Sequence, residues 1–192
     1  MQQAARAGRA QAPTLDAAAW VDAALDLLAE GGVDAVRIDP LAKRLGVTRG
    51  SFYWHFKDRQ ALHDAMLKEW RKRASYRIGA RIESRAATPA ERLRQTLALP
   101  HASPRSKRAA AIELAIRLWA RRDAAAAKAV AHIDDVRLTY YATLFSEMGV
   151  PAAEARRRAF MLYAALMGQA YIVTTAATDV RDELAAMLGI RD

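Results

Sequence analysis

Residues 47–57 of the chain read Val-Thr-Arg-Gly-Ser-Phe-Tyr-Trp-His-Phe-Lys, and this stretch begins a short helix with residues that do little for its stability. Thr48 is a good N-cap residue, but Arg49 places a cation at the positive end of the helix dipole, and Gly50 is a poor helix former. An arginine at this position can reach a phosphate group or the edge of a base, and a glycine beside it lets the backbone approach a groove closely. The stretch therefore predicts a helix whose start contacts DNA.

Two further helices are predicted upstream of this stretch. Residues 38–45 carry apolar side chains on one face, Asp39 and Pro40 suit the start of such a helix, and Gly46 follows where a C-cap turn is expected. Residues 17–30 carry apolar side chains at helical spacing and end at two glycines. A supporting helix followed by a helix, a turn and a second helix is the pattern of a helix-turn-helix, which projects its last helix into the major groove.

Three blocks of sequence carry a resemblance to a known family, in order and with the expected spacing. They are AALDLLAEGG at 23–32, LAKRLGV at 41–47 and YWHFKDRQAL at 53–62. Residues 14–67 thereby resemble the DNA-binding head of the TetR (tetracycline repressor) family of transcriptional regulators. The resemblance implies that the residues facing DNA are Thr48, Arg49, Gly50, Ser51, Tyr53, Trp54 and His55, with Lys57 and Arg59 holding phosphates at the start of the fourth helix.

One position departs from the family pattern. Where the family has a serine or threonine that caps the second helix, this chain has Arg37. We expect this longer side chain to reach a phosphate in place of the capping contact.

The aromatic residues of the stretch have different expected roles. Phe52 and Phe56 are four residues apart, which is the spacing of a buried helix face, so we expect both in the core. Tyr53 and Trp54 can pack on sugar and phosphate or remain in the small core, and the sequence leaves both alternatives open. His55 has no second histidine or carboxylate at ligand spacing, which argues against a metal site.

Composition agrees with this interpretation. The chain has 192 residues, 53% of them hydrophobic, a formal net charge of +9 and no cysteine. The lack of cysteine excludes disulfides and thiolate metal sites and fits a reducing compartment, so we expect the protein in the cytoplasm. Basic residues outnumber acidic ones six to two within residues 37–59, and this local excess favours nucleic acid more than the total charge does.

The chain is expected to divide into three parts. Residues 1–13 have no apolar segment typical of a signal peptide and predict a disordered basic arm, either inert or lying along DNA. Residues 14–58 predict the helix-turn-helix domain, and residues 59–192 a ligand-binding and dimerisation domain.

No strand pattern is visible, and the fold class is therefore all-α. Helices are expected at 58–85, 90–99, 107–121, 124–148, 152–177 and 180–188, with capping signals at Ser106, Asp123 and Asp179.

Residues 159–177 are almost wholly apolar and near the length that spans a bilayer. Their many small and polar residues argue against a membrane helix, and we expect no membrane partner. A helix that is apolar all round must instead be covered on both sides. We expect a face with Phe160, Tyr163, Met167 and Tyr171 to cover its own domain, and a side with Leu162, Leu166 and Val173 to meet a second copy. The family resemblance also implies a homodimer, held by a four-helix bundle.

Polar and aromatic residues of the C-terminal part are candidates for lining a cavity. Each has a structural alternative; for example, Glu113 and Arg117 are four apart and can simply pair. Together they suggest a pocket for a small organic effector, which the family resemblance also implies. No cofactor or metal is expected. The candidates are Arg117, Trp119, His132, Tyr140, Tyr141, Phe145, Tyr163, Met167 and Tyr171.

The sequence does not favour an enzyme. Its four histidines are scattered, and it contains no catalytic triad pattern, no Gly-rich phosphate loop and no H-E-x-x-H motif. We expect a transcriptional regulator, a repressor rather than an activator, that leaves a palindromic operator when an effector binds. Two alternatives stay open: an architectural DNA-binding protein without an effector, and an all-helical enzyme with a site assembled from distant positions.

Overall fold

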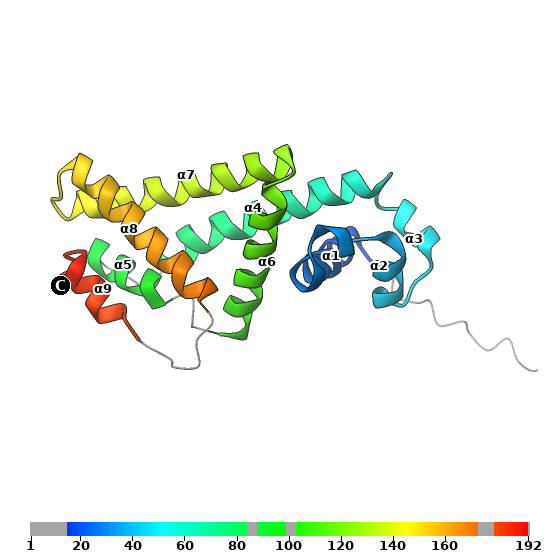
Figure 1. The fold of residues 1–192 in the computed structure, drawn as a ribbon, viewed down its shortest axis with the longest axis horizontal. Coiled ribbons are helices and arrows are strands. Elements are labelled where there is room, and N and C mark those ends of the chain that lie inside the picture. The colour runs from blue at the N-terminus through cyan, green and yellow to red at the C-terminus, as the bar shows by residue number, and fades with distance from the viewer. Residues whose placement is uncertain (1–14, 84–87, 99–102, 173–178, 192) are drawn as a thin grey trace, which may run out of the picture.

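The computed structural model describes residues 15–83, 88–98, 103–172 and 179–191, and for residues 76–83 it describes the backbone alone. All regular structure in these ranges is helical, which confirms the all-α fold (Figure 1). The expected arm at 1–13 and the expected helix ends at 85, 99 and 177 lie outside the described residues. The helices are α1 (Ala17–Gly31), the 3-10 helix η1 (Val33–Ala35), α2 (Ile38–Leu45), α3 (Arg49–Tyr53), α4 (Arg59–Glu83), α5 (Pro89–Ala98), α6 (Pro104–Ala120), α7 (Ala124–Glu147), α8 (Ala152–Tyr171) and α9 (Arg181–Met187).

The first three α-helices form a head at one end of the molecule (Figure 1). Asp16 caps α1 by accepting a hydrogen bond from the backbone N–H of Ala19 at 2.9 Å. Gly46 ends α2 in the left-handed conformation, φ +67°, as its position in the sequence predicts. Trp20 of α1 and Phe52 of α3 are both fully buried and meet edge to face, with ring centroids 5.4 Å apart. Large apolar side chains from separate helices thus hold the helix-turn-helix together.

Some of the expected capping residues are confirmed and others are not. Asp123 caps α7 as expected, accepting from the backbone N–H of Ala126. The cap of α6 is Ser103 rather than Ser106, because Pro104 occupies the first helical position, where its missing N–H costs nothing. For α9 the N-cap is Val180, although Asp179 accepts from the backbone N–H of Arg181 at 3.1 Å. The start of α2 likewise differs: its N-cap is Arg37, which makes no side-chain capping bond, and Asp39 lies inside the first turn.

The remaining helices form an elongated body (Figure 1). The long α4 leaves the head and passes into the body, where α7 packs against it, and α6 contacts both α7 and α1. The apolar core of the head continues into α4, α6 and the first half of α7, where Met66, Ile116 and Ile133 are fully buried. A second core joins α5, the second half of α7, α8 and α9 around Leu93 and Phe145. The core of the head therefore extends past residue 58, and the domain boundary placed there stays a prediction.

The burial of α8 differs from the sequence expectation at three positions, and Val173, expected on the side that meets a second copy, lies outside the described residues. Leu162 and Leu166 are buried within the chain itself, whereas Phe160 is 64% exposed. The reason lies at the first residue of the apolar segment and one turn upstream of it. Ala155 and Ala159 continue the spacing of the two leucines toward the start of the helix, and this stripe of small and branched residues fits closely against α7. Tyr163 is buried as expected.

The helix α8 also ends earlier than expected, at Tyr171, with Ile172 in an extended conformation at its C-cap. Ile172 begins a run of four β-branched residues in the sequence, and such residues are poor helix formers. In the described ranges no helix combines the length and the apolar content that crossing a bilayer requires.

Candidate DNA-binding surface and buried polar cluster

The helix α3 is short and is anchored by one side. Phe52 is fully buried and Phe56, just beyond the helix, is 7% exposed, which confirms that both belong to the core. Thr48 occupies the N-cap position, as the sequence predicts, but its side chain makes no capping hydrogen bond. The hydroxyl of Thr48 is therefore not used by the helix and is exposed beside the start of α3.

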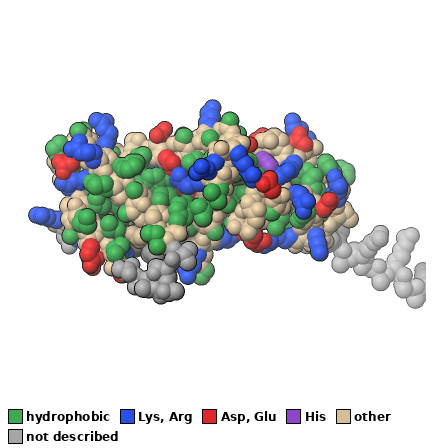
Figure 2. Space-filling model, viewed as in Figure 1, with side chains coloured by type: hydrophobic (Ala, Val, Ile, Leu, Met, Phe, Trp, Pro, Cys, Tyr) green, Lys and Arg blue, Asp and Glu red, His purple; other side chains and the backbone are tan. Residues whose placement is uncertain are grey.

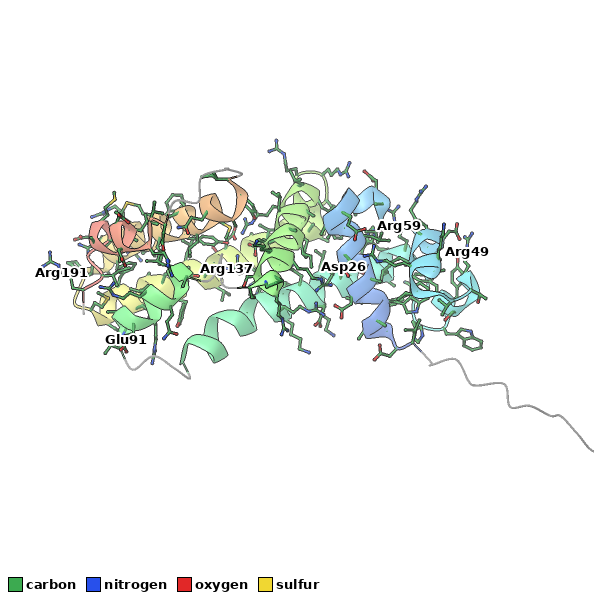
Figure 3. All side chains as sticks on the ribbon, turned by 90° about the horizontal axis from the view of Figure 1, so that it is seen from below. Asp26, Arg49, Arg59, Glu91, Arg137 and Arg191 are labelled. Carbon is green, nitrogen blue, oxygen red and sulfur yellow. The ribbon has the colours of Figure 1, made fainter. Side chains whose placement is uncertain are left out.

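The opposite side of α3 faces solvent. Figure 3 shows Arg49 pointing outward at the end of the molecule farthest from Arg191. Trp54 is 87% exposed, whereas Tyr53 is 51% exposed and packs edge to face on the buried Phe52, with centroids 5.3 Å apart. The residues predicted to face DNA therefore form one exposed surface, in which only Ser51 is half-buried; besides Arg49, Tyr53 and Trp54 it contains Thr48, Gly50, His55 and Lys57.

Two arginines flank this surface on neighbouring elements. Arg37 is exposed at the N-terminus of α2, where the expected reach to a phosphate stays a prediction. Arg59, at the start of α4, donates from Nη2 to the backbone carbonyl of Val33 in η1 at 2.7 Å. Part of the Arg59 guanidinium therefore fixes α4 to the head, and its contact with phosphate also stays a prediction.

Two acidic residues of α1 are paired on the side of the head that faces the body. Asp26 of α1 bonds Arg108 of α6 at 2.6 Å, and in Figure 3 it lies at the junction between head and body. Asp22 bonds Arg73 of α4, again at 2.6 Å. These pairs neutralise carboxylates that would repel DNA and leave the α3 surface with an excess of positive charge. Two further pairs have the same effect, Asp34 with Arg122 and Glu30 with Arg44.

A second candidate site is a polar cluster inside the body, built from three helices. Arg137 of α7 donates from Nη2 to Glu113 of α6 at 2.9 Å and from Nη1 to the Tyr163 hydroxyl of α8 at 2.8 Å. Arg117 of α6 donates to Asp134 of α7 at 2.6 Å. The Tyr163 hydroxyl donates to Asp134 at 2.6 Å. Figure 3 shows Arg137 lying among the helices of the body.

The charges of this cluster stabilise one another. Burial alone would raise the pKa of Glu113, but the hydrogen bond and positive charge of Arg137 outweigh it and hold this pKa below its usual value. Burial would also raise the pKa of Asp134, but the hydrogen bonds from Arg117 and the Tyr163 hydroxyl hold this pKa below its usual value. Burial raises the pKa of Tyr171, at the end of α8, to about 12. All the carboxylates and guanidinium groups of the cluster are therefore charged at neutral pH, with two charges of each sign.

The structure brings together only some of the predicted cavity residues. Arg117 and Tyr163 are in the cluster, Tyr141 packs near Tyr163 with ring centroids 6.3 Å apart, and Tyr140 packs on Tyr141. The expected pairing of Glu113 with Arg117 is confirmed. Met167 and Tyr171 lie on the last turns of α8, whereas Phe145 is fully buried in the second core and His132 is exposed on α7.

Trp119 is placed elsewhere. It packs edge to face on His63 of α4 at 4.9 Å, at the junction between head and body, because residues two apart on α6 point to different sides of the helix. His63 is 8% exposed, and its Nε2 makes no hydrogen bond with the described residues. Its proximity to Trp119 joins residues 56 positions apart in the sequence, and no local pattern indicates it.

Arg137 is the member of the cluster that sequence reasoning missed. A signal for it exists, since Ile133, Arg137, Tyr141 and Phe145 follow one another at intervals of four residues, all four are buried, and an arginine in such a stripe needs a buried partner. Among the described residues, no three histidines, aspartates or glutamates are grouped as a metal site would require.

A helix-turn-helix head with an exposed recognition helix, joined to an all-helical body, defines the class of protein. Residues 21–66 match the family of bacterial regulatory proteins named tetR. The head of the chain therefore carries the DNA-binding segment of the TetR family.

Comparison with known proteins supports this assignment. The head is 52% identical over 46 residues to the tetracycline repressor protein class A from transposon 1721 of Escherichia coli, a match that covers 24% of this chain and 21% of the repressor. The matched segment thus spans about a fifth of that relative's length. Two solved structures share the fold over most of their length. A TetR-family regulator from a Rhodococcus species has a TM-score of 0.69 at 19% identity, covering 91% of this chain and 97% of that one. A regulator from Saccharomonospora viridis in complex with choline has a TM-score of 0.73 at 20% identity, covering 90% and 93%.

Proposed function

We propose that the chain is a DNA-binding transcriptional regulator, a homodimeric repressor that a small organic effector releases from a palindromic operator. The observation that carries this proposal is the exposed side of α3, where Arg49 at its start and Trp54 at its C-cap point to solvent while Phe52 between them is buried. Burial of Phe52 fixes the orientation of the exposed side chains, so they are positioned before DNA binds. Such a protein acts on the chromosome and therefore in the cytoplasm.

The exposed residue types match the chemistry of the major groove. Arg49 can donate two hydrogen bonds to a guanine, and the Thr48 and Ser51 hydroxyls can bond bases or phosphates. Lys57 is 83% exposed and can neutralise a phosphate. Its weak contact with Asp58, at 3.9 Å, leaves the ammonium group available.

The dimer surface that we propose lies on α7 and α8 and differs from the leucine side expected from sequence. Phe160 and Met161 of α8 are 64% and 52% exposed, and Met187 of α9 is 82% exposed. A groove of about 660 Å³ runs between α7 and α8, with Leu138 and Phe160 in its wall. In Figure 2 hydrophobic side chains gather over this end of the molecule. Exposed apolar side chains gathered on neighbouring helices are typical of an interface between subunits.

The effector site that we propose lies beside the polar cluster of α6, α7 and α8. The Tyr171 hydroxyl is buried beside Arg117, with which it interacts, and its own O–H can still donate a hydrogen bond to a ligand. The choline complex of the Saccharomonospora viridis regulator supports the idea that this fold holds a small organic molecule. The relatives compared above are regulators, which agrees with a role that involves no catalysis.

The cluster is connected to the head through packed side chains. Glu113 and Arg137 line a cavity of about 30 Å³ together with Leu25 of α1, Arg73 and Arg108. The two latter arginines hold the carboxylates of α1. A ligand that rearranges the cluster would therefore change the contacts that orient the head.

DNA binding is tested by selecting sequences from a randomised duplex library and then measuring affinity for the selected duplex. Arg49→Ala should weaken this affinity by about 1 to 3 kcal/mol and leave thermal stability equal or slightly higher, since the cation opposes the helix dipole. Arg191→Ala is the matched control, because Arg191 lies at the opposite end of the molecule (Figure 3). The proposal fails if Arg49→Ala costs stability but not affinity. Binding that does not depend on sequence would favour the architectural alternative.

A further inference from the structure

An acidic side chain lies within the surface proposed to contact DNA. Asp39 is in the first turn of α2, its side chain is 72% exposed, and its Oδ1 lies 3.6 Å from Nη1 of Arg49. A carboxylate in this position repels phosphates, and it is not needed as a cap, because Arg37 is the N-cap residue. The other acidic residue of segment 37–59, Asp58, does have a structural role, because it accepts from the backbone N–H of Ala61 at the start of α4.

Asp39 restricts the orientation of the Arg49 guanidinium. The Arg49 guanidinium has a hydroxyl neighbour, Tyr53, on its own helix and the Asp39 carboxylate on the adjacent helix, and both favour its charged form. The distance of 3.6 Å is an ion pair that engages one of the guanidinium nitrogens. A guanidinium has five donors in a planar fork, so the contacts with Tyr53 and Asp39 leave some of them available. The pair therefore orients the fork without saturating it.

We propose that Asp39 and Arg49 together select a guanine in each half-site of the DNA, a proposal that rests on the DNA-binding function proposed above. Arg49 donates two hydrogen bonds to O6 and N7 of the guanine, which is the geometry that its fork matches. Asp39 acts as a positioning residue. It holds the guanidinium toward the base edges and, by its charge, keeps the adjacent space unfavourable for a phosphate.

The physical reason for such a pair is the competition between bases and phosphates. A flexible, exposed arginine can turn to the DNA backbone, where contacts add affinity without reading sequence. An exposed ion pair in water is weak, so it does not prevent Arg49 from moving when it is free. On entering the groove the pair loses water, its attraction grows, and turning away to a phosphate would leave the carboxylate unpaired near negative charge. Asp39 therefore lowers the affinity for non-specific DNA and raises the selectivity for one base.

The experiment compares four proteins in the same selection from a randomised duplex library, followed by titration of the selected duplex and of duplexes with each base substituted. The proteins are the unmodified chain, Asp39→Asn, Arg49→Ala and Asp58→Asn. The last is a matched control, since it removes the same charge from the same segment and asparagine still caps a helix. Thermal unfolding verifies that each variant is folded.

The unmodified chain should prefer guanine at one position of each half-site by about 5- to 150-fold, the range of a good bidentate contact. Arg49→Ala should abolish this preference. Asp39→Asn should reduce it several-fold while raising affinity for non-specific DNA, with a salt dependence that is steeper by about one unit per subunit, as expected when Arg49 turns to a phosphate. Asp58→Asn should raise non-specific affinity and leave the guanine preference unchanged.

Two results would overturn the inference and leave the proposed function intact. One is a selected half-site with no guanine at the position affected by Arg49→Ala. The other is an Asp39→Asn protein that keeps the full preference, which would mean that Asp39 only favours the start of α2 through the helix dipole. If the unmodified chain enriches no sequence, the proposed function itself fails, and the inference fails with it.

Discussion

At the residue scale, side chains close together at α3 serve either the core or the surface. Phe52 is fully buried against Trp20, while Trp54, two positions later, is 87% exposed. The same division occurs inside the body, where Arg137 is buried in an otherwise apolar stripe of α7 and is tolerated because Glu113 and Tyr163 satisfy its donors. A buried charge of this kind is stable only as long as its partner is charged.

Glu113→Gln should therefore lower the free energy of unfolding by about 3 to 5 kcal/mol, because it leaves Arg137 buried without a counter-charge. The pKa of Glu113 is lowered in the folded state, so its contribution is fully present above the unfolded pKa, about 4.5, and is lost as the pH falls through the folded value. Urea unfolding at pH 7 and at pH 4 measures both effects. The difference between the two proteins should shrink at pH 4, and a difference independent of pH would contradict this assignment.

At the scale of elements, the junction between head and body combines apolar packing with charge. The helix α1 packs against α4 and α6, and ion pairs from Asp22, Asp26 and Asp34 surround this contact. His63 of α4 lies inside it against Trp119 of α6. Burial lowers the pKa of His63, and the positive charge of Arg59 acts in the same direction. Two carboxylates, Asp123 before α7 and Asp64 on α4, act against this shift without reversing it.

Acid should loosen this junction. Because the pKa of His63 in the folded state is below the unfolded value of about 6.5, the folded state binds the proton less well, and stability falls as the pH drops from 6.5 toward the folded pKa. His63→Gln removes the titration and keeps a side chain of similar size. Between pH 7.5 and about pH 5 the unmodified chain should lose more stability than the variant. Parallel pH profiles in chemical denaturation would exclude His63 as the cause.

At the scale of the whole molecule, the function that we propose depends on the distance between the two heads of a dimer. In a dimer the recognition helices must lie roughly 34 to 36 Å apart to enter successive major grooves. The long α4 connects each head to the body, and the apolar surface that we assign to the dimer is at the other end, on α7, α8 and α9. A change in the body can therefore alter the spacing of the heads.

The dimer is tested by comparing two neighbouring positions on α8. Phe160→Glu should give a folded monomer, because the side chain is 64% exposed in the single chain and becomes buried only in the proposed dimer. Leu162→Glu should instead unfold the domain, since Leu162 is fully buried within its own chain. Light scattering after size exclusion gives the mass, and circular dichroism gives the fold. A Phe160→Glu protein that stays dimeric, or an unmodified chain that is monomeric at micromolar concentration, would refute this surface.

Effector and operator should bind with negative coupling of about 1 to 3 kcal/mol, and the coupling must be the same in both directions. Titrating operator DNA with and without a pocket ligand found by screening measures it. Arg137→Leu should remove most of the coupling, because Arg137 belongs both to the cluster and to the small cavity that adjoins α1. Unchanged operator affinity at saturating ligand would show that the occupied site does not control DNA binding.

The sequence by itself determined the helix-turn-helix and its outward face, and it did so because the signals are local. Gly46 ends α2, Asp123 caps α7, and the spacing of Phe52 and Phe56 defines the buried side of α3. Capping, chain reversal and helical periodicity act over a few residues, and each can be recognised without knowing what packs nearby. The exposure of Arg49 follows from the same spacing.

Only the tertiary structure decided which side of α8 is buried and which charges meet inside the body. Leu162 and Phe160 are both apolar, but the packing of α8 on α7 leaves Leu162 fully buried and Phe160 64% exposed. The contact of Arg137 with Glu113 joins positions 24 residues apart. Such choices depend on how helices far apart in the sequence dock, because hydrophobic burial rewards any well-packed arrangement and periodicity within one helix does not distinguish among them.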